Sequence, residues 1–195
     1  MSCTPVTPEM HELLEALCAW PDIDTDDLRR RSEWEQARKW GWIMASGELQ
    51  LSRDLKRHVL TTLLDASAAH HGACLGIIAR DRVSQALKLI NPDDSWDSDS
   101  NARRSLFMAE TFGSLSRRRR LELLSMDGAT LIDQRGGILA GGAILRVPGG
   151  SPGGGRTAAA RAISEYGVGI KVSQDGPITA FVSEDGSMLE HFRMG

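Results

Sequence analysis

The chain has little of several features that would fix its class at once. Its three cysteines are far apart in the sequence and form no Cys-x-x-Cys pair, so no disulfide framework is indicated. No apolar run approaches the length needed to cross a membrane. The first residues also lack a basic region followed by an apolar stretch, as a signal peptide would have. We therefore expect a cytoplasmic protein without membrane contacts.

The chain also lacks an excess of positive charge. Its net charge is -3 and its isoelectric point is near 6.0, so it has no general attraction for nucleic acid. Hydrophobic residues make up 41% of the chain and charged residues 25%, which is typical of a globular protein. A length of 195 residues allows one medium domain together with a small one. DNA is thus not an expected partner.

Residues 1–54 are predicted to form a small, mainly helical unit. Apolar spacing predicts a helix over residues 9–20, and capping patterns predict two shorter helices that end by Gly41. A small hairpin over residues 42–51 would complete a unit that resembles a winged helix. Acidic residues outnumber basic ones in this segment, which favours a protein partner or a dimerisation cap over DNA binding.

Residues 55–195 are predicted to form an α/β domain, because strand and helix patterns alternate along them. An uninterrupted apolar run predicts a buried strand over residues 72–79, and polar residues predict a loop over 91–104. The remaining predicted elements are helices over 54–69, 105–124 (broken near Gly113) and 158–165, and strands over 129–133, 138–145, 169–173 and 177–182.

Two charged clusters receive an ordinary structural interpretation. The run Arg117–Arg120 would spread over all faces of a helix, so we expect a solvated surface, with steering of phosphates as the alternative. His70 and His71 lack a carboxylate or cysteine at ligand spacing. We therefore expect them at a helix C-terminus, where the helix dipole favours them, and not at a metal.

Two other segments carry candidate chemistry. Asp127 precedes a predicted strand, where it could cap a turn, bind a metal ion or orient a ribose hydroxyl. A Gly-rich segment over residues 149–155 leads into a helix through Arg156 and Thr157. Such a segment can be a plain flexible connection, but backbone N–H groups at a helix N-terminus attract anions. Arg can also donate two hydrogen bonds to one phosphate. The pair of segments indicates a nucleotide site.

These residues support a resemblance to a known family. Residues 125–132, which contain Asp127-Gly128-Ala129, resemble the DGA motif region of the diadenylate cyclase (DisA N-terminal) domain family. The resemblance covers about residues 55–185. It implies a mixed β-sheet flanked by helices, and two domains that meet face to face, each with an ATP. In that family each 3′-hydroxyl attacks the partner's α-phosphate, and the products are cyclic di-AMP and pyrophosphate.

The resemblance further implies a homo-oligomer and a Mg²⁺ or Mn²⁺ ion at Asp127, close to the reacting hydroxyl. The match is incomplete at the second motif, which reads Gly-Thr-Arg-His-Arg-Ala-Ala in the family. Here Arg156 is retained, but Thr157 replaces the His and Ala158 the second Arg. A charge-assisted contact contributes about 1.5–3 kcal/mol. Losing two could therefore slow a reaction by roughly two to four orders of magnitude.

The resulting prediction is a divergent diadenylate-cyclase-like domain that binds ATP or a cyclic dinucleotide for signalling. An active cyclase, which would be a nucleotidyltransferase, is one alternative, and a ligand-responsive winged-helix regulator is another. Asp127 is the predicted catalytic and metal-binding residue. The predicted nucleotide-binding residues are Gly128, Ala129, Gly154, Gly155, Arg156, Thr157, Ser164 and Glu165.

Overall fold

The computed structural model describes residues 49, 51–94, 111–147, 154–184 and 187–194. Its helices are α3 (Arg53–Ala68), α4 (Val83–Ala86), α6 (Arg117–Leu124) and α7 (Gly155–Ser164), with short 3-10 turns at Arg80–Arg82, Leu87–Leu89 and Pro92–Asp94. Its strands are β1 (Ala73–Ile78), β2 (Ala129–Asp133), β3 (Ile138–Ala143), β4 (Gly167–Val172), β5 (Ile178–Glu184) and β6 (Ser187–Met194).

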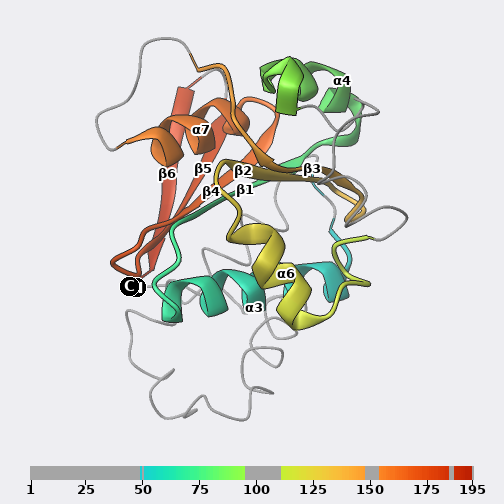
Figure 1. Ribbon diagram of the computed structural model, residues 1–195. Coiled ribbons are helices and arrows are strands. Elements are labelled where there is room, and N and C mark those ends of the chain that lie inside the picture. Colours follow the sequence, from blue (N-terminus) through green and yellow to red (C-terminus); the bar gives the residue numbers. More distant parts are fainter. Residues whose placement is uncertain (1–48, 50, 95–110, 148–153, 185–186, 195) are drawn as a thin grey trace, which may run out of the picture.

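The strands form one mixed sheet of six, in the order β3-β2-β1-β4-β5-β6. β1 and β2 run parallel, and every other neighbouring pair is antiparallel. Helix α7 lies on one face of the sheet against β1, β4 and β5, whereas α3 and α6 cover the other face (Figure 1). Strand β1 is buried along its whole length, because both faces are covered. The predicted α/β fold with a mixed sheet flanked by helices is confirmed.

Helix α3 begins where the sequence pattern places it. The Ser52 side chain accepts a hydrogen bond of 3.3 Å from the backbone N–H of Leu55 and so caps the first turn. The apolar stripe of the helix, which includes Val59 and Leu63, is buried against the sheet and α6. After the helix, His70 adopts a positive φ of 55°. The two histidines therefore follow the helix C-terminus, as predicted.

The N-terminal predictions fall mostly outside the described residues. This applies to the helices before Gly41 and to most of the hairpin over residues 42–51, as well as to the loop beyond Asp94 and the helical stretch over 105–110. Leu49 and Leu51, which were expected in a hairpin strand, have no strand assignment. Both side chains are buried in the core of the α/β domain instead.

One prediction near α6 is confirmed in its described part, and another was wrong. The break expected near Gly113 in the helix over residues 105–124 is present: Thr111 forms a β-bridge with Gly137, a turn follows it, and α6 begins at Arg117. Arg120 is not a solvated side chain but is buried, and donates hydrogen bonds to the Thr62 hydroxyl and the Leu115 carbonyl. Burial lowers the pKa of its guanidinium. The sequence also gave no expectation of β6.

Candidate functional site

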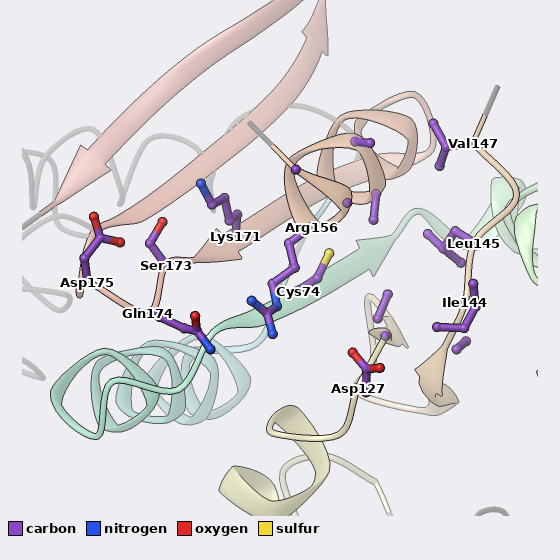
Figure 2. Close-up of a pocket in the computed structure, with 17 residues that line it drawn as sticks. Cys74, Asp127, Ile144, Leu145, Val147, Arg156, Lys171, Ser173, Gln174 and Asp175 are labelled. Atoms are coloured by element: carbon purple, nitrogen blue, oxygen red, sulfur yellow. The ribbon is translucent and has the colours of Figure 1, made fainter. Parts of the chain in front are cut away.

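A cavity of about 630 Å³ opens between the N-terminus of α7 and the face of the sheet beneath it. Figure 2 shows side chains from the α6–β2 loop, the segment after β3, α7 and the β4–β5 turn around it. The lining residues are Cys74, Asp127, Gly128, Ala129, Ala143, Ile144, Leu145, Val147, Gly154, Gly155, Arg156, Ala158, Ala159, Lys171, Ser173, Gln174 and Asp175. The two motifs that the sequence singled out therefore meet at one cavity.

The floor of the cavity is a single row of residues across the sheet. Ala143 of β3 pairs with Ala129 of β2, and Cys74 of β1 pairs with Lys171 of β4. The parallel register of β1 and β2 places Cys74 beside Ala129, one step before the pair formed by Leu75 and Thr130. Side chains in such a row point to the same face of the sheet. The three short side chains of Ala143, Ala129 and Cys74 therefore leave the hollow, and Lys171 follows them in the row before Thr179 of β5.

The loop that carries Asp127 is fixed by its neighbours. The Thr130 hydroxyl donates a hydrogen bond of 3.1 Å to the Leu123 carbonyl, which ties β2 to the end of α6. Gly128 has a φ of 104°, and a β-carbon there would lie 2.6 Å from the backbone of Gly142 and Ala143. Only glycine fits this position. The Asp127 side chain is exposed and points toward the cavity (Figure 2).

The N-terminus of α7 forms the opposite wall. Gly154 precedes the helix with a φ of 85°, and its carbonyl accepts hydrogen bonds of 3.1 Å from the N–H groups of Thr157 and Ala158. No side chain caps this end. Among the described residues, the N–H groups of Gly155 and Arg156 have no acceptor. Unpaired N–H groups and the helix dipole together favour an anion at this wall.

Arg156 extends from α7 along the start of β1 (Figure 2). A β-carbon on Gly72 would lie 2.4 Å from its Nη1 atom and 2.7 Å from its Cζ atom, so the guanidinium occupies the space that a side chain at Gly72 would need. Burial raises the pKa of the Cys74 thiol to about 12, and the charge of Arg156 acts in the opposite direction. Arg156 is partly buried and forms no ion pair within the described part of the chain.

The space beside Gly72, which the Arg156 guanidinium occupies, leads to a first prediction. In Gly72→Ala the new methyl group displaces the flexible end of Arg156, so the affinity of the cavity for an anion such as ATP should fall by up to about tenfold. The free energy of unfolding should change little, because the displaced group is the end of a flexible side chain. Calorimetric titration with ATP measures the first quantity and urea denaturation the second. When Arg156 is already replaced by methionine, Gly72→Ala should have no further effect on affinity. An equally large loss of affinity in that double variant would contradict the prediction.

Three predicted site residues lie away from the cavity. Thr157 is buried on α7 and does not line it. Ser164 and Glu165 lie at the other end of this helix of ten residues, where the Ser164 hydroxyl donates a hydrogen bond of 2.7 Å to the Arg161 carbonyl. Ala158 lines the cavity but carries no donor. The structure therefore brings together Asp127, Gly128, Ala129, Gly154, Gly155 and Arg156, and does not bring Thr157, Ser164 or Glu165 to the same cavity.

Arg161 lies on α7, one helical turn beyond Thr157. Its guanidinium lies over the Phe181 ring, at 5.5 Å from the ring centre. The Nε atom of Arg161 is buried without a hydrogen-bond partner. Arg161 does not line the cavity.

Sequence reasoning missed several lining residues. Ser173, Gln174 and Asp175 belong to the β4–β5 turn, and Ile144, Leu145 and Val147 form an apolar wall beyond β3. The side chain of Ile144 is 45% exposed, and among the described residues no other large hydrophobic side chain is exposed. Lys171 was detectable in principle, because it is the one charged residue inside the apolar run of β4.

A complete metal site made by the protein alone is not seen. The described residues contain no group of three His, Cys, Asp or Glu side chains that could hold a metal ion. Asp127 and Asp175 line the same cavity, however. Mg²⁺ is usually held by one or two carboxylates together with the phosphates of a substrate. The donor set thus fits a metal ion that arrives with a phosphorylated ligand.

Comparisons with known proteins show the fold and no more. No family model matches the chain, and no curated protein matches it. A structure described as a hypothetical membrane spanning protein from Bacillus cereus has a TM-score of 0.57 and 15% identity, and the match covers 96% of this chain and 87% of the other. This likeness establishes a shared fold.

A second solved structure, a double mutant of DacA from Staphylococcus aureus, has a TM-score of 0.46 and 19% identity, over 72% of this chain and 90% of that one. A likeness at this level carries no argument about this protein. Within the described residues, no helix combines the length and the apolar character that a membrane crossing requires.

Proposed function

We propose that the cavity binds a phosphorylated nucleotide, ATP or a cyclic dinucleotide, and that binding serves signalling. The observation that carries this proposal is the convergence of Asp127 and Arg156, which are distant in the sequence, on one cavity of about 630 Å³. This volume lies within the range of about 300–1,000 Å³ that small-molecule sites occupy.

The cavity offers different chemistry at its two ends. Phosphates would lie against the N-terminus of α7, where Gly155 and Arg156 present N–H groups and a guanidinium. The base would lie against the apolar wall formed by Ile144, Leu145 and Val147. Asp127 would orient a ribose hydroxyl or hold a Mg²⁺ or Mn²⁺ ion that comes with the phosphates.

Binding is favoured over catalysis by what the cavity lacks. The His and second Arg of the family motif are Thr157, which is buried, and Ala158, which has no charge. Arg161 is engaged with Phe181 and does not supply a substitute. The retained Asp127-Gly128-Ala129 sequence supports the alternative, an active diadenylate cyclase that converts two ATP into cyclic di-AMP and pyrophosphate. That reaction would require a homo-oligomer with two facing sites.

Two measurements on the full chain test the proposal. Isothermal titration with ATP, AMP and cyclic di-AMP in the presence of Mg²⁺ should detect binding of at least one of them. Incubation with ATP and Mg²⁺ or Mn²⁺, followed by mass spectrometry, should yield no cyclic di-AMP. Product formation that Asp127→Asn abolishes would establish the cyclase alternative. If no nucleotide binds at millimolar concentration, the proposed function is wrong.

Residues 1–54 would carry the output of such a sensor, through a protein partner. The winged-helix alternative rests on the basic run Arg29–Arg31 in an otherwise acidic segment. A salt-dependent shift of DNA that requires these arginines would favour that alternative.

A further inference from the structure

The floor of the cavity contains a charged residue that the family motif does not account for. We propose that Lys171 is a second anion-binding residue, which acts with Arg156 on a ligand that carries two or more phosphate charges. This inference rests on the proposed nucleotide site, and it adds both a residue and a charge requirement to it.

The position of Lys171 is the first argument. It lies in β4 between the buried residues Ile170 and Val172, and its side chain is partly buried. In the row across the sheet it lies between Cys74 of β1 and Thr179 of β5, and the members on the β1 side, Cys74, Ala129 and Ala143, are small. Among the residues of the row that line the cavity, lysine has the longest side chain. Two cationic residues therefore line the cavity, Lys171 from β4 and Arg156 from α7.

The charge balance is the second argument. Lys171 is the cross-strand partner of Cys74, and the charge of Arg156 is felt by the same thiol. Both residues thus adjoin Cys74, Lys171 through its backbone position and Arg156 through its charge. The described residues provide neither cation with an ion pair. Both side chains are partly buried, and an anion in the cavity would balance charges that the described residues leave without a counter-ion.

The third argument is the gap left in the second motif. Ala158 lines the cavity where the family has its second arginine, and Thr157 is buried instead of offering an imidazole. The helix consequently supplies a single cationic side chain, Arg156, to this wall. Lys171 supplies a positive charge to the same cavity from a different element. A phosphate-binding function is therefore retained with different residues.

The test compares Lys171→Met with the unaltered protein by calorimetric titration of ATP and AMP. Loss of a charge-assisted contact should weaken ATP binding by about tenfold or more, and AMP binding by less. The difference in ATP affinity between Lys171→Met and the unaltered protein should narrow as salt is added, because salt screens the lysine charge. Lys171→Arg should keep most of the affinity. Lys88→Met removes an exposed charge outside the cavity and serves as the matched control.

Different failures have different meanings. Unchanged ATP affinity in Lys171→Met would overturn the role of Lys171 and leave the nucleotide site standing, whereas absence of binding to the unaltered protein would overturn the site itself. The Tm of the ligand-free variant should stay equal or rise, because a partly buried charge is removed. A clear fall in that Tm would show that Lys171 already has a partner within the protein, and it would also overturn the proposal. Lys171→Gln repeats the comparisons of ATP affinity and Tm with a side chain that is neutral but still polar.

Discussion

Gly169→Ala should lower the free energy of unfolding by about 3 kcal/mol or more. Gly169 lies in β4 beneath α7, and a β-carbon there would lie 1.8 Å from the carbonyl oxygen of Ala160 and 2.6 Å from its carbonyl carbon. These atoms belong to the helix backbone, so no side-chain rotation can relieve the overlap. The helix would have to move away from the sheet, and contacts such as that of the buried Ile163 would be lost.

Urea denaturation of the purified variant measures this loss. Gly155→Ala provides the matched control, because a β-carbon at Gly155 meets no atom within 4 Å. The control should be neutral or slightly stabilising, since alanine favours the helix more than glycine does. Equal stability of the two variants would contradict the close packing of α7 on β4.

The second large effect is expected for Arg156→Met. Methionine keeps most of the apolar length but removes the charge and the fork of donors, so ATP affinity should fall by about 10- to 150-fold. The free energy of unfolding should change little, because Arg156 forms no ion pair within the described residues. Arg156→Lys should be intermediate, since an ammonium group cannot donate in the planar two-fold geometry of a guanidinium.

Calorimetric titration distinguishes these outcomes. Arg118→Met serves as the control, because Arg118 is exposed and pairs only with Glu122 along α6. If Arg156→Met binds ATP as tightly as the unaltered protein, the phosphates do not lie at the N-terminus of α7. In that case the orientation of the ligand in the cavity would have to be reversed or abandoned.

Local patterns predicted the elements that have strong local causes. The apolar run of β1, the helix α3 and the strands β2 and β3 were all recognisable. Features that depend on distant partners were not. Arg120 looked like part of a solvated run, and it is buried because Thr62 and the Leu115 carbonyl accept its hydrogen bonds. The break near Gly113 was expected from its glycine, but its cause, the bridge between Thr111 and Gly137 across the fold, was not.

The same division applies to the cavity. Asp127 and Arg156 were found because each stands in a recognisable motif. Lys171 and the β4–β5 turn were missed because their approach to those motifs depends on sheet order, which places β4 next to β1. Ser164 and Glu165 were included through sequence resemblance, but their distance from the cavity follows from the length of α7.

The row of residues beneath the cavity has a consequence for folding. Its members come from β3, β2, β1 and β4, which are separated along the chain by α6 and α7. No hairpin or helix by itself contains the floor, so the cavity exists only when strands from distant parts of the chain have joined. A ligand held there stabilises the assembled domain as a whole and not one element of it. Occupancy and global folding are therefore coupled, and the cavity should be among the last features to form as the domain folds.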